Sequence, residues 1–184
     1  MYIDKSTGLL DNCELCLSPN KDNRPPATNI DLIVVHSISL PPGNYGGKAV
    51  EQFFQNKLDK NDHPYFEEIH EMQVSSHILI KRSGEIIQFV PFHERAWHAG
   101  KSNYHGRECC NDFSIGIELE GTDTDNFEDI QYQQLAKLIS ALQHTYPDID
   151  EHITGHSDIA PGRKTDPGAG FDWDKLNSYR TIRT

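Results

Sequence analysis

Hydrophobic residues in this chain fall into short runs between polar stretches and stretches rich in proline and glycine. One run lies in residues 31–37, where four consecutive apolar residues from Leu32 to Val35 precede His36. A segment that is apolar throughout predicts a strand buried near the centre of a sheet. The longest apolar runs have four residues, whereas a membrane-spanning helix needs roughly 20.

Polar and apolar residues alternate from residue 113 to residue 120. A period of two is typical of a strand that places one face on the core. The alternation puts Glu118 on a face of small and polar side chains, which we expect to be open to solvent or to a cleft. The expected faces are Phe113, Ile115, Ile117 and Leu119 on one side and Ser114, Gly116, Glu118 and Glu120 on the other.

Residues 76–81 and 85–90 are rich in β-branched residues and are separated by a turn that contains Ser83-Gly84. This pattern predicts a β-hairpin.

Helical spacing recurs in three segments. We expect helices over residues 48–58 and 172–179, and a longer one between them. Asp125, with Glu128 three residues later, is a plausible start for the longer helix, and Pro147 bounds its end. The apolar positions that carry the pattern are Val50, Phe53, Phe54, Leu58, Leu135, Leu138, Ile139 and Leu142.

The order of these elements predicts an α+β fold with a mixed central sheet and helices packed against it. At 184 residues the chain fits a single domain. Residues 1–28 are polar and contain three prolines, so we expect an irregular N-terminal segment packed on a domain of residues 29–184.

The net charge of -11 argues against nucleic acid and anionic membranes as partners, because both attract cationic surfaces. A small soluble substrate fits better. No basic start followed by an apolar stretch opens the sequence, so we expect a cytoplasmic protein. The sequence does not fix the oligomeric state, and we favour a monomer.

Four cysteines allow two interpretations. Cys13-x-x-Cys16 and Cys109-Cys110 could form a structural zinc site, although the second pair lacks the usual spacing. The favoured interpretation is unpaired thiols, with Cys13 and Cys16 in a flexible leading segment.

Residues 155–168 form a loop rich in proline and glycine that holds His156, Lys164 and Asp166. Such loops carry function more often than packing. With His36 at the end of the first strand, the two histidines and the aspartate make three ligands, and catalytic zinc leaves its fourth position to water. The pattern predicts a zinc hydrolase. His77, His98 and His152 remain alternative ligands.

Further candidates follow from the same chemistry. Glu118 is the expected general base, with Glu120 as its rival. Lys164 could stabilise an oxyanion, and Arg107 could grip a substrate carboxylate. Trp97 could stack on a sugar ring or pack in the core.

Five blocks of the sequence carry specific motifs, at residues 34–43, 63–66, 95–100, 111–123 and 155–168. Together these blocks resemble the AmpD family, the cytosolic 1,6-anhydro-N-acetylmuramyl-L-alanine amidases of peptidoglycan recycling. The resemblance extends from about residue 19 to residue 180.

The resemblance implies a zinc amidase with the fold shared by amidase-2 enzymes and peptidoglycan recognition proteins, acting on a small muropeptide. The residues that match the family are His36, His156 and Asp166 as zinc ligands, Glu118 as the catalytic glutamate, Lys164 as the transition-state lysine, and Trp97, His98 and Arg107 in segments that line the substrate groove.

The chain departs from the family pattern at a few positions. Ser37 stands where an Asn is frequent, Gln73 where an Arg is frequent, and Ser157-Asp158 replaces a Cys-Asn pair. Asp158 could orient His156 or compete for the metal.

The expected reaction is hydrolysis of the amide between the lactyl group of the anhydro-sugar and L-alanine of the stem peptide. Three alternatives remain: an amidase of intact peptidoglycan, a non-catalytic muropeptide-binding module, and a regulator that senses muropeptides.

Overall fold

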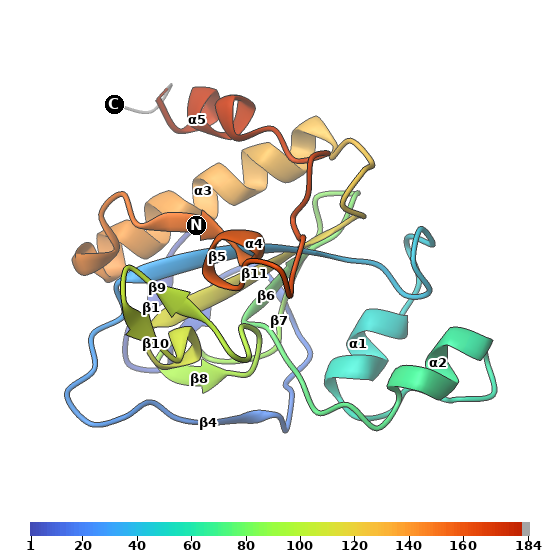
Figure 1. The fold of residues 1–184 in the computed structure, drawn as a ribbon. Coiled ribbons are helices and arrows are strands. Elements are labelled where there is room, and N and C mark those ends of the chain that lie inside the picture. Colours follow the sequence, from blue (N-terminus) through green and yellow to red (C-terminus); the bar gives the residue numbers. More distant parts are fainter. Residues whose placement is uncertain (182–184) are drawn as a thin grey trace.

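A mixed six-stranded sheet forms the centre of the protein in this computed structural model, which describes residues 1–181 (Figure 1). Strands β12, β5, β11 and β6 are parallel, and β7 runs antiparallel to β6 with β3 parallel beside it. The expectation of a mixed central sheet with flanking helices is therefore confirmed. Residues 182–184 of the predicted domain lie outside the described residues. In sheet order the strands are β12 (Ile153–Gly155), β5 (Leu32–Ile38), β11 (Ser114–Glu120), β6 (Ile78–Ile80), β7 (Ile86–Gln88) and β3 (Glu14–Leu15).

The two longest strands, β5 and β11, lie where the sequence predicts strands, each starting one residue later than expected. The predicted hairpin is formed by β6 and β7, with shorter arms than expected. Gly84 has a φ of 84°, a left-handed conformation that glycine adopts readily in turns. The N–H of Gly84 donates to the carbonyl of Lys81 at 2.8 Å, which closes the turn.

Helix α3 (Asp129–Thr145) covers one face of the sheet, and α5 (Trp173–Thr181) packs over α3 (Figure 1). The N-terminal cap of α3 differs from the prediction. Glu128 is the N-cap, and its side chain and that of Gln131 bond reciprocally to backbone N–H groups. Asp125 instead accepts a hydrogen bond from Tyr45. The main core lies between α3 and the inner side chains of the sheet, among them Ile33, Val35, Ile115, Ile117, Leu119, Leu135, Leu138, Ile139 and Leu142.

The placement of Phe113 with the apolar face of β11 is wrong. A 3-10 turn, η1 (Cys110–Asp112), leads into Phe113, and the strand begins only at Ser114. Phe113 therefore packs on the opposite side of the sheet, with Leu32 and Val34.

Helices α1 (Ala49–Phe54) and α2 (Pro64–Ile69) lie together beside the sheet (Figure 1). Helix α1 is shorter than expected because the chain turns at Asn56, which has a φ of 59°. Helix α2 was not expected. The ring of His63 accepts a hydrogen bond from the N–H of Tyr65 and caps the helix, and Pro64 occupies its first turn.

The N-terminal segment is more regular than expected. It contains a small hairpin, the sheet-edge strand β3, and β4, which pairs with β8. The remaining elements are β1 (Ile3–Asp4), β2 (Leu9–Leu10), β4 (Lys21–Asn23), β8 (Glu94–Ala96), β9 (Asn103–Tyr104), β10 (Arg107–Glu108), η2 (Pro147–Ile149) and α4 (His156–Ile159).

All four cysteines are free thiols. Cys13 packs against the core under α3, whereas Cys16 packs against the separate cluster around α1. Within residues 1–181 the four cysteines do not come together in a group that could hold a metal ion. The described part of the chain also has no helix of the length and apolarity needed to cross a membrane.

Candidate metal centre and active site

Three neighbouring parallel strands bring the predicted site together at their carboxyl ends. His36 lies near the end of β5, Glu118 is its register partner on β11, and His156 directly follows β12. The carboxyl ends of parallel strands are where open α/β sheets bind ligands.

Asp166 joins the two histidines from the loop after α4. The Nδ1 atoms of His36 and His156 are 3.0 Å apart, and each lies 3.0 Å from Oδ2 of Asp166. Neighbouring ligand atoms of a tetrahedral zinc site with bonds of about 2.0–2.1 Å are about 3.3 Å apart. The observed triangle is close to that spacing, and its donor atoms are those that zinc prefers. Among the residues described, no other group of His, Cys, Asp and Glu side chains has such an arrangement.

Asp123 ties together the two segments that present these side chains. Its carboxylate accepts hydrogen bonds from the hydroxyl of Ser37, next to His36, and from that of Thr165, next to Asp166. The N–H of Ser157 also donates to the Asp166 carbonyl at 2.9 Å. This role of Asp123 could not be predicted from the sequence, because its partners lie far from it along the chain.

The electrostatics of the triangle favour neutral imidazole beside an ionised carboxylate. Burial lowers the pKa of His36 to about 4, and the contact with the Asp166 carboxylate opposes this shift only in part. Burial alone would raise the pKa of Asp166, but its contacts with His156 and His36 hold it below its ordinary value. Neutral imidazole and ionised carboxylate are the protonation states that bind a metal cation.

Glu118 faces the same space and is only 7% exposed. Its Oε2 atom is buried and has no hydrogen-bond partner within residues 1–181. Burial raises the pKa of Glu118 well above its ordinary value, the charge of Asp166 adds to this, and Lys164 opposes it. A buried, unpaired carboxyl is costly to maintain, and such groups cluster at functional sites.

The rival glutamate, Glu120, is engaged elsewhere. One of its carboxylate oxygens accepts a hydrogen bond from the N–H of Gly46 at 2.6 Å, and the other accepts one from the N–H of Arg82 at 3.0 Å. Glu120 therefore fixes the loop before α1 to the sheet.

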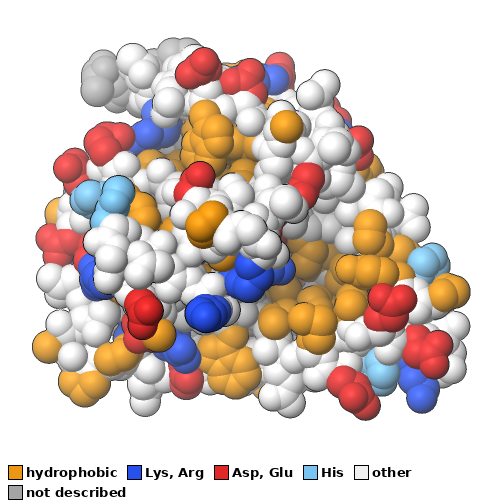
Figure 2. Space-filling view, in the orientation of Figure 1, with side chains coloured by type: hydrophobic (Ala, Val, Ile, Leu, Met, Phe, Trp, Pro, Cys, Tyr) orange, Lys and Arg blue, Asp and Glu red, His pale blue; other side chains and the backbone are white. Residues whose placement is uncertain are grey.

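A pocket of about 570 Å³ opens over the triangle. His36, Glu118, His156, Lys164 and Asp166 all line it. Opposite them stands an apolar wall, and Figure 2 shows hydrophobic side chains gathered over α1 and α2 beside a hollow in the surface. The wall includes Leu40, Pro42, Phe53, Phe54, Tyr65, Ile69, Met72, Val74 and Trp97.

The three predicted substrate contacts differ in position. Trp97 lines the pocket, and its buried Nε1 has no hydrogen-bond partner in the described residues. His98 also lines it, but its two ring nitrogens are bonded to His36 and Ser114. Arg107 is not brought to the pocket. Its guanidinium pairs with Asp31 at 2.5 Å and stacks over the ring of Phe113, and neither of these partners lines the pocket.

The alternative histidines have structural partners. Nδ1 of His77 accepts from the N–H of Gly116, and its Nε2 donates to the carbonyl of Glu94. His152 precedes β12 and lies 3.1 Å from the hydroxyl of Tyr104. Neither belongs to the ligand triangle.

Two of the departures from the family pattern have local explanations. Asp158 accepts hydrogen bonds from the N–H of Gly155 and the hydroxyl of Thr154, both at 3.0 Å. It therefore caps the start of α4, and it does not belong to the triangle of possible ligands. Ser37 donates to Asp123. Gln73 is exposed, between two residues that line the pocket.

Comparisons with known proteins find one matching family and several similar chains. The model of the N-acetylmuramoyl-L-alanine amidase family matches residues 26–169. The 1,6-anhydro-N-acetylmuramyl-L-alanine amidase AmpD of Escherichia coli K12 is 59% identical over 86% of this chain and 87% of its own. A crystal structure of an AmpD derivative superposes with a TM-score of 0.94 at 54% identity, over 97% of this chain and 99% of that one.

A more distant structure contains a ligand. It is the E. coli N-acetylmuramyl-L-alanine amidase AmiD in complex with the substrate anhydro-N-acetylmuramic acid-L-Ala-D-γ-Glu-L-Lys. It is 31% identical with a TM-score of 0.60, and the match covers 85% of this chain and 60% of that one.

Proposed function

The chain belongs to the N-acetylmuramoyl-L-alanine amidase family, and on that premise we propose that it hydrolyses an anhydro-muropeptide. The bond cleaved is the amide between the lactyl group of 1,6-anhydro-N-acetylmuramic acid and L-alanine of the stem peptide. Two relatives that are 59% and 57% identical carry this activity in their names, and the match covers most of both chains.

The proposal includes a zinc ion held by His36, His156 and Asp166, whose donor atoms form the 3.0 Å triangle. Zinc there would act as a Lewis acid that polarises the scissile carbonyl and makes water a better nucleophile.

Glu118 acts as the general base. Its carboxylate takes a proton from the attacking water and later delivers that proton to the leaving amine of L-alanine. The raised pKa makes Glu118 a stronger base than an ordinary carboxylate, so it takes the proton from water more readily and holds it until the amine leaves. Lys164, exposed at the rim of the same pocket, stabilises the oxyanion that develops on the attacked carbonyl.

The pocket wall suggests how the substrate is held. Its apolar side chains, including Trp97, offer a surface for the face of the sugar ring and for the methyl groups of the lactyl and alanyl units. Because Arg107 lies outside the pocket, we do not propose it as the carboxylate anchor.

The observation that carries the proposal is the convergence of a metal-ligand triangle and a buried, unpaired Glu118 in one pocket. A module that only binds muropeptides, or a regulator that senses them, would have no need to bury an unpaired carboxyl. An amidase of intact peptidoglycan would use the same catalytic groups. Only a comparison of substrates can therefore distinguish that alternative from the proposed enzyme.

The test is a comparison of substrates with purified, zinc-loaded protein. Anhydro-muramyl-tripeptide, the matching reducing muramyl-tripeptide and intact peptidoglycan are supplied separately, and released peptide is measured by liquid chromatography. Faster turnover of the anhydro form supports the proposal. Preferential cleavage of intact peptidoglycan would favour the alternative enzyme, and tight binding without cleavage would favour a recognition module.

The family branch that the chain resembles acts in the cytosol on small soluble muropeptides. A cytoplasmic location is therefore part of the proposal, to be tested by fractionation; the monomeric state favoured above is to be tested by light scattering.

A further inference from the structure

The outward-facing nitrogens of both site histidines contact consecutive residues of one segment. Nε2 of His36 lies 2.9 Å from Nδ1 of His98, and Nε2 of His156 lies 3.1 Å from the carbonyl oxygen of Ala99. The segment after β8 thus contacts both histidines of the triangle on the side away from the ligand atoms.

The tautomer of His156 follows from its partner. Nε2 of His156 also lies 3.5 Å from the guanidinium of Arg163, but that group donates at shorter distances to the carbonyls of Ala99 and Lys101. The nearer Ala99 carbonyl oxygen only accepts hydrogen bonds, so Nε2 of His156 carries the hydrogen in this contact. In a neutral imidazole the other nitrogen then has a free lone pair. Nδ1, the atom that faces the triangle, is therefore the ligand atom.

The tautomer of His36 is determined by a longer chain of hydrogen bonds that ends on a carbonyl. The hydroxyl of Ser114 donates to the carbonyl oxygen of Cys110 at 2.5 Å. Having donated its only hydrogen, this hydroxyl accepts from Nε2 of His98, 3.1 Å away. Nδ1 of His98 is then unprotonated and accepts from Nε2 of His36. This leaves Nδ1 of His36 with a free lone pair towards Asp166.

We propose that His98 and Ser114 are positioning residues that fix His36 in the tautomer and orientation needed to bind the metal. His98 was expected to bind substrate, but its two nitrogens are used in this chain. Partners of this kind behind metal-binding histidines commonly set metal affinity.

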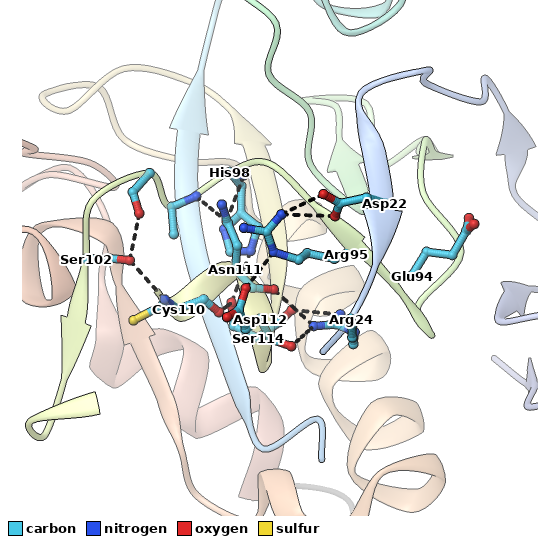
Figure 3. A network of polar contacts seen from close by, with 12 residues as sticks. Asp22, Arg24, Glu94, Arg95, His98, Ser102, Cys110, Asn111, Asp112 and Ser114 are labelled. Carbon is cyan, nitrogen blue, oxygen red and sulfur yellow. Dashed lines mark hydrogen bonds and ion pairs between the residues drawn. The ribbon is translucent and has the colours of Figure 1, made fainter. Parts of the chain in front are cut away.

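Asn111 holds the same segment in place. Its Oδ1 accepts from the N–H of His98 at 3.0 Å and from that of Ala99 at 2.7 Å. One side chain therefore fixes the residues that back both histidines, and Figure 3 shows Asn111 beside His98 with Cys110 and Ser114 next to it.

The surrounding scaffold keeps this arrangement rigid. The guanidinium of Arg24 donates to the carbonyls of Asn111, Asp112 and Ser114 at 3.1, 2.9 and 2.9 Å (Figure 3). Gly116 provides the space for the imidazole, because a Cβ there would lie 2.4 Å from Cγ of His98.

This inference rests on the proposed zinc site and goes beyond it. Removing a hydrogen-bond partner behind a metal-binding histidine typically lowers metal affinity by about 10–100-fold. We expect a loss in that range for Ser114→Ala, since His98 could then adopt the other tautomer and place the hydrogen of His36 on its ligand atom. His98→Leu, which removes the acceptor, should lose affinity in the same range.

The experiment measures the zinc dissociation constant by competition with a chromophoric chelator. Ser114→Ala and His98→Leu should bind zinc more weakly, and Ser114→Thr, which keeps the hydroxyl, should recover most of the affinity. Ser76→Ala is the matched control, because Ser76 is also fully buried but its hydroxyl has no hydrogen-bond partner in the described residues. Unchanged zinc affinity in Ser114→Ala and His98→Leu would overturn the inference.

A second measurement needs no variant and so does not depend on whether Ser114→Ala folds. Nitrogen-15 NMR of the metal-free protein reports the tautomer of each imidazole. The expected spectrum has the hydrogen on Nε2 of both His36 and His98. A hydrogen on Nδ1 of His36 would contradict the inference.

His36→Ala separates this inference from the zinc site itself. If that variant binds zinc as well as the unmodified protein, the proposed metal site is wrong. If it loses zinc while Ser114→Ala and His98→Leu keep full affinity, the ligands stand and only the positioning role fails.

Discussion

His36 and Glu118 are register partners on the neighbouring parallel strands β5 and β11. Partners on parallel strands present their side chains to the same face of the sheet, so strand pairing alone sets the proposed metal ligand beside the proposed base. A slip of one residue would turn Glu118 into the core under α3. The chemistry of the site therefore depends on the register of these two strands.

Glu118→Gln should abolish most turnover while zinc stays bound. The amide is similar in shape but cannot accept and return a proton, and general base catalysis typically contributes about 10²–10⁴-fold. Steady-state kinetics and zinc content of the same preparation check this. Glu120→Gln is the matched control: it should lower the free energy of unfolding by about 1 kcal/mol and leave most activity intact. A fast Glu118→Gln enzyme would remove Glu118 from the mechanism.

Asp166→Ala should lose zinc, because it removes one corner of the ligand triangle. Elemental analysis after dialysis measures the zinc content. Asp158→Ala, eight positions earlier in the same segment, should keep its zinc and lose about 0.5–2 kcal/mol of stability as a helix-capping interaction is removed. Full zinc occupancy in Asp166→Ala would refute the ligand assignment.

Gly116→Ala should weaken zinc binding without touching a ligand. The new Cβ would lie 2.4 Å from Cγ of His98 and 2.7 Å from its Nδ1, so the ring must move away from His36. Overpacking of this kind typically costs about 1–3 kcal/mol. Gly47→Ala is the control, because its Cβ would meet nothing closer than 4.0 Å. Thermal unfolding and chelator competition should separate the two variants, and equal behaviour would argue against close packing of His98 on β11.

The metal-free protein should lose stability as the pH falls below about 6.5. Burial lowers the pKa of His36 to about 4 and holds the pKa values of His77 and His98 well below the ordinary value of 6.5. At pH values between 6.5 and these lowered pKa values, the unfolded chain binds protons that the folded protein does not. Acid therefore favours unfolding. Each such group contributes up to about 1.4 kcal/mol per pH unit. Urea unfolding at several pH values, with chelator present, measures the slope.

Glu118 affects the pH dependence of stability in the opposite direction to the histidines. Its raised pKa means that the folded metal-free protein keeps a proton that the unfolded chain has released, so its contribution to stability is lost as the pH rises. Glu118→Gln should therefore steepen the slope and stabilise the metal-free protein at neutral pH. A shallower slope in this variant would contradict the assigned shift.

Much of the fold could be predicted because its signals are local. Alternation places Ile115 and Ile117 on the core and Glu118 opposite them, as the structure has it. Asp166 lies ten positions after His156, and residues 156–166 hold a one-turn helix and a loop that folds back. Helix α3 follows from its spacing, although its cap does not.

The remaining features depend on contacts between segments that are distant in sequence. Asp123 joins Ser37 and Thr165, and His98 meets Ser114, only once the sheet has formed. Arg107 has the chemistry of a carboxylate anchor, but in the fold its charge pairs with an aspartate outside the pocket. Residue type alone does not show whether such a side chain will contact the substrate or another part of the fold.

The most direct test of the central claim is mass spectrometry of the products formed from anhydro-muramyl-tripeptide in ¹⁸O-labelled water. Hydrolysis of the proposed amide predicts free tripeptide without label and an anhydro-sugar whose lactyl carboxylate carries ¹⁸O. Release should stop when a chelator removes the metal and return when zinc is added. Intact substrate, label in the tripeptide, or release that continues without metal would contradict a zinc-dependent amidase acting at this bond.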